Sequence, residues 1–191
     1  MIWVAAVWEA NEGAVDAMAD VVVRRAIDDQ GGYGNPAQFD AFVVGGSTVD
    51  IDALAGLGAQ VWAWRVEEHA PRTGFGRCDV AMVSLMRRNP AMSHAEFAAH
   101  WTGRHAPLAL RRHVGLHDYH QYVVRETLTP TAPEIDGIAV LGFITRADFD
   151  ERFFDSDEGR AEIMADVARF MDRPGRDTTL VGPPGPTHAA G

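Results

Sequence analysis

Apolar and polar positions along the chain predict a mixture of strands and helices. In the first half, short apolar runs predict strands at 1–8, 39–44 and 60–66. Residues 14–27 repeat apolar side chains at helical spacing and are expected to form a helix. A short helix is expected at 51–57, and the Gly- and Pro-rich segments 30–36 and 71–76 are expected to be loops.

The second half begins with a strand at 79–86 and a helix that starts at Ser93. Glu96 follows three residues later and completes the signature of a capping box. We expect this helix to weaken at Gly103 and to stop before Pro107, because the residue before proline avoids helical geometry. The remaining elements are expected to be a helical turn at 108–113, a strand at 116–125, a loop at 126–135, a strand at 137–144, helices at 147–154 and 157–171, and a strand at 178–181.

The order of these elements predicts an α+β fold with a ferredoxin-like antiparallel sheet and helices on one face. The second half, 78–182, has the full βαββαβ order, whereas the first half, 1–75, is a degenerate version with one strand missing or unclear. A weak repeat supports two tandem halves, because residues 40–52 resemble 136–148. Residues 183–191 are expected to form a disordered tail, so truncation after Val181 should matter little.

Composition and charge restrict the classes of function. No apolar run reaches the roughly 20 residues of a membrane-spanning helix, and the N-terminus lacks a basic leader. The net charge is −10, which disfavours nucleic acids and anionic membranes as partners. Cys78 is the only cysteine, so an intrachain disulfide and a thiolate zinc site are excluded, and a cytoplasmic location is expected.

Several segments resemble a known family when they are taken together. The segments are FAAHWTGRHAPLALR, GLHDYHQYVV, DGIAVLGF and EGRAEIMADVARFMD. They resemble the EthD-type domain of the dimeric α+β barrel superfamily over about residues 79–181. The resemblance implies two ferredoxin-like units that pack through their sheets into a barrel, either as a monomeric pseudo-dimer or as a homodimer. It also implies a pocket between the sheet and the helices of a unit.

The resemblance further implies a small hydrophobic ligand, often aromatic or polyketide-like. We therefore expect a small oxidoreductase or oxygenase that acts on a carbonyl compound through a histidine acid/base, without an organic cofactor. A polyketide cyclase or decarboxylase of the same superfamily is an alternative, as is a non-catalytic ligand-binding module. Some members of the superfamily bind haem, so haem binding through a histidine also stays open.

Six of the eight histidines lie between Ser93 and Val124. His113, His117 and His120 have a spacing similar to that of metal ligands, but Gly115 interrupts any helix there. On the strand that follows, the side chains of His117 and His120 point to opposite faces. No HExxH motif or cysteine pair is present, so no metal site is expected.

His105 is the expected catalytic acid/base, because it stands at a helix end within the segment that resembles the family motif. An imidazole exchanges protons near neutral pH, although a capping role is the alternative. Phe97 and Trp101 form an aromatic stripe that serves as core, as ligand-binding wall, or as both. His94 and His100 are expected to be surface or capping residues.

Tyr119 and Gln121 share one face of their strand, where Tyr119 is expected to be catalytic and Gln121 to bind ligand. The Tyr119 hydroxyl is expected to donate a hydrogen bond to a substrate oxygen, or else to be a core group. Asp166 and Phe170 lie one helical turn apart. Asp166 is expected to hold His105 in one tautomer or, alternatively, to pair with arginines on a solvated face, and Phe170 is expected to bind ligand.

Overall fold

The computed structural model describes residues 1–31, 37–74, 78–172 and 177–185. The first half contains β1 (Ile2–Ala10), α1 (Glu12–Asp16), β2 (Val21–Ala26), β3 (Ala41–Gly45), α2 (Ile51–Ala55) and β4 (Gly58–Arg72). The second half contains β5 (Val80–Arg88), α3 (His94–His100), a π-helical turn (Trp101–His105), α4 (Ala106–Arg112), β6 (Leu116–Thr127), β7 (Gly137–Phe143), α5 (Arg146–Arg152), α6 (Asp157–Phe170), β8 (Met171–Asp172) and β9 (Thr178–Pro184).

The two halves have the same sheet topology. The first half places its strands in the order β4-β1-β3-β2, and the second half uses the corresponding order β9-β5-β7-β6. Both are the strand order of a ferredoxin-like βαββαβ unit, and every pairing is antiparallel. The predicted fold class, an α+β barrel made of two tandem halves, is therefore confirmed.

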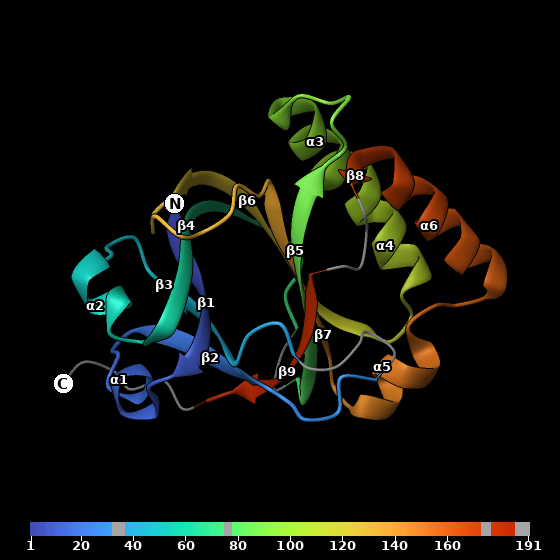
Figure 1. Cartoon of the computed structure of the whole chain (residues 1–191). Helices are drawn as coiled ribbons and strands as arrows, with labels where there is room; N and C mark the ends of the chain where they lie inside the picture. The colour runs from blue at the N-terminus through green and yellow to red at the C-terminus, as the bar shows by residue number, and fades with distance from the viewer. Residues whose placement is uncertain (32–36, 75–77, 173–176, 186–191) are drawn as a thin grey trace.

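The two sheets join at both edges into one ring of strands, visible at the centre of Figure 1. The first junction is the long pairing of β4 with β6, which extends along β4 from Trp64 to Arg72. The second junction, between β2 and β9, is short, and its registered pairs are Arg24–Pro184 and Ala26–Val181. The ring is therefore uneven, with one strong and one weak seam.

The helix predicted at 14–27 is wrong. Only the five residues of α1 are helical there, and Val21–Ala26 forms β2, the strand that the sequence pattern left unclear. Val21, Val22 and Val23 are β-branched and favour extended backbone. Pairing with β3 on one side and β9 on the other then stabilises the strand.

Side chains alternate between the interior of the ring and its outer surface. In β1, Val4 and Ala6 point inward, whereas Trp3, Ala5 and Val7 point outward. The interior cluster combines both halves and includes Phe42, Trp64, Val83, Tyr122, Val140 and Val181. The ring is thus a packed core and leaves only its outer faces for helices.

Helices cover the two outer faces to different extents. In Figure 1, α1 and α2 lie beside the first sheet, and α3–α6 lie beside the second. Helices α1 and α2 have only five residues each, whereas α6 alone spans Asp157–Phe170. Among the described helices, none is both long and apolar enough to cross a membrane. The larger helical layer of the second half provides the space for a pocket.

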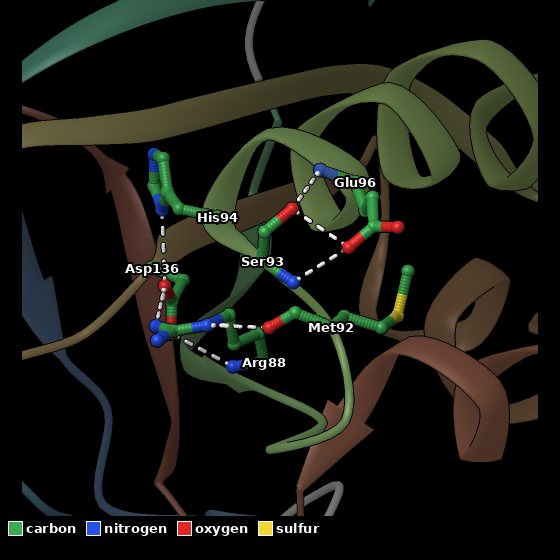
Figure 2. Close-up of polar contacts among 6 residues, drawn as sticks. All are labelled: Arg88, Met92, Ser93, His94, Glu96 and Asp136. Carbon is green, nitrogen blue, oxygen red and sulfur yellow. Dashed lines mark hydrogen bonds and ion pairs between the residues drawn. The ribbon is translucent and has the colours of Figure 1, made fainter.

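The start of α3 is fixed by the predicted capping box and by a neighbouring carboxylate, both shown in Figure 2. The Glu96 backbone N–H donates to Ser93 Oγ at 3.2 Å, and the Ser93 N–H donates to Glu96 Oε2 at 2.8 Å. Asp136 accepts from Arg88 Nη1 at 2.6 Å and from His94 Nδ1 at 3.0 Å. This network attaches α3 to β5 and to the residue before β7.

The weak seam leads to a prediction about the C-terminal end of the chain. β9 continues to Pro184, so the expected tail starting at residue 183 begins too early; residues 186–191 lie outside the described part. Arg24 Nη1 donates to the Gly182 carbonyl, and the Gly185 N–H donates to the Val23 carbonyl.

We expect a chain ending after Val181 to melt below one ending after Gly185, because it lacks these two hydrogen bonds of the seam. Two such bonds contribute about 2 kcal/mol, or about 4–8 °C in Tm for a chain of this size. Differential scanning calorimetry of the two truncated chains measures the difference. Equal melting temperatures would show that these two hydrogen bonds do not contribute to stability.

Candidate functional site

The sequence predicted that the helix capped by Ser93 would stop before Pro107, and this prediction is wrong. The helix continues through the π-helical turn Trp101–His105 into α4. Pro107 has no N–H to donate to an earlier carbonyl, and its ring crowds the preceding turn. The wider π-turn, in which the Ala106 N–H donates to the Trp101 carbonyl, avoids this conflict. As a result, Trp101 and His105 both line one pocket.

A pocket of about 190 Å³ lies between this helical layer and the outer face of β5 and β7. Its lining is largely apolar and consists of Met82, Ser84, Met86, Trp101, His105, His113, Tyr119, Ala139, Leu141, Phe153, Phe154, Ile163, Met164, Val167, Phe170, Met171 and Thr178. None of these described lining residues is Asp, Glu, Lys or Arg. An apolar pocket with a few converging polar groups has the character of a small-molecule site.

His105 lies in the pocket wall with 9% of its side chain exposed. Its Nδ1 donates a hydrogen bond to Asp166 Oδ2 at 2.9 Å, and its ring packs 5.0 Å from that of Phe170. Burial lowers the pKa of His105, and the hydrogen bond to Asp166 opposes this shift only in part. The ring is therefore neutral at pH 7, and its Nε2 can accept a proton.

Asp166 on α6 is shared by two histidines. Its Oδ1 accepts a hydrogen bond from His100 Nε2 at 2.9 Å, while its Oδ2 accepts from His105. His100 was expected at the surface or in a cap, but only 13% of its side chain is exposed, and its ring stacks on Phe170 at 5.2 Å. Residues five apart diverge on an α-helix, and only the π-turn brings His100 and His105 to one carboxylate.

Tyr119 lines the pocket, and Gln121 hydrogen-bonds the Tyr119 hydroxyl from outside the pocket. The Gln121 amide donates to the Tyr119 hydroxyl at 2.9 Å and to the Trp101 carbonyl at 3.1 Å, and its own oxygen lies 2.7 Å from His69 Nδ1. Burial raises the pKa of Tyr119, so its hydroxyl keeps its proton and can donate it to a ligand oxygen. Gln121 itself does not line the pocket.

Of the four residues expected to bind ligand, Trp101 and Phe170 line the pocket, whereas Phe97 and Gln121 do not. Phe97 packs behind the wall, with its ring 5.4 Å from Trp101 and 5.8 Å from Phe170. It supports the two aromatic rings that face the cavity. The aromatic stripe therefore serves both as core and as wall, but through different residues.

Because Gly137 has no side chain, the indole ring of Trp101 can pack directly against β7. A Cβ atom at position 137 would lie 2.5 Å from Cζ3 of Trp101, closer than such atoms approach in proteins. The preceding residue, Asp136, anchors Arg88 and His94 at the start of the same helical layer (Figure 2). Asp136 and Gly137 thus set the position of the pocket wall without touching the cavity.

The histidines with metal-like spacing do not converge. His113 faces the Phe153 carbonyl at 2.6 Å, whereas His120 hydrogen-bonds Glu68 and Asp118. Within the described residues, no group of three His, Cys, Asp or Glu side chains has the arrangement of a metal site. His113 lines the pocket, a role that its spacing from the other histidines did not predict.

The first half has a hollow of about 480 Å³ beside α1 and β2. Its described lining includes the ion pair of Arg25 with Asp16, and Arg25 also pairs with Glu12. No histidine, cysteine or tyrosine lines it among the described residues. Of these two cavities, the one in the second half is therefore the one lined by histidine and tyrosine.

Comparison with known proteins agrees with this division. The model of the EthD domain family matches residues 89–174. This segment is an EthD domain. It contains His100, His105, Tyr119 and Asp166, and it extends from the start of α3 to the end of α6.

Solved structures share the fold of the whole chain. An anthrone oxidase-like protein aligns with a TM-score of 0.61 and 11% identity, over 100% of this chain and 95% of its own. Two mutants of chlorite dismutase from Candidatus Nitrospira defluvii align with a TM-score of 0.54 and 12% identity, over 97% of this chain and 92% and 91% of theirs. No curated protein matches the chain in sequence. At these identities the likeness establishes the fold alone.

The close approach of Gly137 to Trp101 yields a prediction about the EthD domain. We expect Gly137→Ala to lower the free energy of unfolding by about 1–3 kcal/mol, because the methyl group displaces the indole. Urea unfolding followed by tryptophan fluorescence measures this effect. Gly103→Ala is the matched control, because a methyl group at position 103 would point into open space. An equal effect of both substitutions would contradict the proposed contact.

Burial of His113 predicts how stability depends on pH. Burial lowers the pKa of His113 from 6.5 to about 4. The unfolded chain therefore binds this proton more tightly, and stability is lost as the pH falls from about 6.5 to about 4. Between pH 7 and pH 5, His113 should account for a loss of about 2 kcal/mol. Urea unfolding of the parent and of His113→Gln at both pH values should show a smaller loss in the variant; equal losses would exclude this linkage.

Proposed function

We propose that the chain is a small oxidoreductase that uses dioxygen, without an organic cofactor, on neutral hydrophobic aromatic carbonyl compounds. The observation that carries the proposal is His105, oriented by Asp166 in the wall of an apolar pocket. The fold likeness to an anthrone oxidase-like protein supports the same class of reaction. A neutral imidazole that a carboxylate orients is the arrangement of a general base.

In the proposed reaction, His105 Nε2 removes a proton from a carbon whose anion is conjugated with an aromatic carbonyl group, such as the CH₂ group of an anthrone. The hydroxyl of Tyr119 donates a hydrogen bond to the oxygen where negative charge develops. The resulting imidazolium is stabilised by Asp166, whose orientation His100 maintains. His100 is thus a positioning residue, because it acts through Asp166 and does not line the pocket.

Dioxygen is the oxidant of the proposed reaction. For an anthrone, the deprotonated carbon transfers electrons to dioxygen and forms a carbon–oxygen bond. The product of this step is the anion of a hydroperoxide. The second hydrogen of the CH₂ group then leaves as a proton while the O–O bond breaks, so that the carbon becomes a carbonyl group and the outer oxygen atom departs with this proton as hydroxide. The base returns its proton to this hydroxide, which makes water and leaves the enzyme unchanged.

The size of the pocket restricts the substrate. A buried cavity of about 150 Å³ accommodates benzene, so about 190 Å³ encloses one ring of a substrate, and the other rings of a fused system such as anthrone extend towards the mouth. Met82, Met86, Met164 and Met171 line the cavity, and the flexible thioether side chains adapt to larger outlines. Met164 is half exposed, so part of a longer substrate can extend to the mouth of the pocket.

The pocket residues do not fit haem. The volume of about 190 Å³ lies below the roughly 300–1,000 Å³ of pockets for drug-sized ligands. The described lining also offers no Arg or Lys for the propionate groups of a haem. These features support a reaction carried by the protein side chains and the substrate itself.

We also propose that one chain acts as a monomeric pseudo-dimer. Both junctions of the ring form within the chain, so the described strands of the barrel leave no unpaired sheet edge for a second copy. The single buried cysteine is compatible with the reducing cytoplasm as its location.

The test is dioxygen uptake in an oxygen electrode with anthrone as the substrate, together with the absorbance of anthraquinone. We expect enzyme-dependent oxidation that His105→Phe lowers by about 10²–10⁴-fold, because the base is lost while the ring is kept. Asp166→Asn should lower kcat by a smaller factor and alter its pH profile. Tyr119→Phe should also have a smaller effect, since it removes only a hydrogen-bond donor.

The matched control is His94→Ala, which removes a histidine of the same helix that contacts Asp136 and not the pocket. It should retain the parent rate. Oxidation by His105→Phe at the parent rate would overturn the role of the base. The absence of any enzyme-dependent dioxygen uptake would overturn the oxidase proposal; exchange of the substrate C–H in D₂O would then favour a cyclase or decarboxylase.

A further inference from the structure

A second histidine of the pocket, His113, has no part in the mechanism above. It follows α4 and is buried, with 3% of its surface exposed. Its Nδ1 lies 2.6 Å from the carbonyl oxygen of Phe153. Because a carbonyl oxygen only accepts hydrogen bonds, Nδ1 carries the hydrogen. In the neutral ring, Nε2 therefore has a free lone pair.

The surroundings of His113 keep the ring neutral and fixed. Its ring contacts those of Phe153 at 4.7 Å and Phe154 at 5.1 Å. Burial lowers its pKa to about 4, and nearby His105 lowers it further, while the Phe153 carbonyl and Asp155 act in the opposite direction. At neutral pH, His113 is thus a rigid hydrogen-bond acceptor rather than a second acid.

The acceptor atom of His113 is available to a ligand. No donor from the described residues bonds to Nε2, whereas Nδ1 is held by Phe153. An acceptor in an apolar wall is costly if it stays unpaired. Among the other polar side chains that line the cavity, Ser84 and Thr178 bond each other at 2.9 Å. His105 is held by Asp166 through Nδ1 and keeps its Nε2 for the proposed proton transfer, and Tyr119 offers a donor rather than an acceptor.

We infer that Nε2 of His113 accepts a hydrogen bond from a hydroxyl group of the ligand and makes the pocket selective for neutral phenols. The inference rests on the proposed function only in that it assigns the ligand of the same pocket. A phenol supplies an apolar ring for Phe170 and Phe153 and one strong donor for His113. Anionic ligands are disfavoured, because no Arg or Lys lines the described cavity.

The selectivity can be measured without turnover. The probes are 4-fluorophenol and 4-fluoroanisole, titrated into the full chain and followed by ¹⁹F NMR. The anisole is the more hydrophobic of the two but has no donor, so transfer from water alone favours the anisole. We expect the phenol to bind at least about tenfold more tightly, because only the phenol pairs the buried acceptor.

His113→Phe is the deciding variant, because it keeps an aromatic ring and removes the acceptor. It should bind 4-fluoroanisole as the parent does and lose the preference for the phenol. Ser84→Ala is the matched control and should retain the preference, since it removes a different oxygen from the same cavity. Circular dichroism and Tm establish that each variant is folded.

A second measurement on the parent avoids any folding defect of the variant. The ¹⁵N signal of His113 Nε2 should have the position of an unprotonated nitrogen and should shift when 4-fluorophenol saturates the pocket. A parent that does not prefer the phenol would overturn the inference. A His113→Phe variant that keeps the preference, or an Nε2 signal that does not shift, would also overturn it.

The outcome is separable from that of the oxidase proposal. Selective binding of the phenol with no oxidation of anthrone would reject only the oxidase reaction. Oxidation of anthrone through His105, with equal binding of phenol and anisole, would reject only the role of His113.

Discussion

Closure of the sheet is the constraint on which the rest of this structure depends. A ferredoxin-like unit covers one sheet face with helices and leaves the other apolar face open. Here Phe42 and Trp64 of the first half and Tyr122 and Val140 of the second half share one interior. Joining the sheets at both edges covers both open faces and pairs the edge strands. Because the interior is filled, the pocket lies outside the ring, under the helices of the second half.

The two halves share a topology but differ in what their helical layers can do. Five-residue helices are sufficient to cover Val7 on the first sheet, because Val15 of α1 and Leu54 of α2 join the same apolar cluster. In the second half, the helix from His94 to Arg112 is continuous, because a π-turn accommodates Pro107. That turn brings the rings of His100 and His105 to one carboxylate. The π-turn that accommodates Pro107 thus also creates the cluster of two histidines and one carboxylate at the site.

The sequence predicted features that depend on local patterns. The alternation in the strands and the capping box of Ser93 are set by neighbouring residues, and both are present. The strand at Val21–Ala26 was missed because its partner β9 is distant in the sequence, and pairing decides its conformation. The contact of His100 with Asp166 was missed because it needs a π-turn, which helical periodicity does not predict.

The site, like the fold, combines residues that the sequence could indicate with contacts that depend on distant segments. The resemblance to the family motif led to His105, and the structure places Asp166 against it. Which aromatic and amide groups face the cavity depends on packing depth, so Phe97 and Gln121 could not be separated from Trp101 and Phe170 by spacing alone. The same reasoning explains His113, whose burial and link to Phe153 arise from the approach of a segment forty residues away.

The placement of charge explains why the site suits proton removal from a neutral molecule. Asp166 stabilises a protonated His105 but is not part of the cavity wall. A carboxylate inside the cavity would oppose the negative charge that develops on the substrate oxygen. In the proposed arrangement, the protonated His105 ring lies between the Asp166 carboxylate and the substrate anion and stabilises both negative charges. His100 satisfies the second oxygen of Asp166, so that carboxylate needs no water from the pocket. The proposed chemistry thus requires a cavity without formal charge before the reaction, and the described lining has this property.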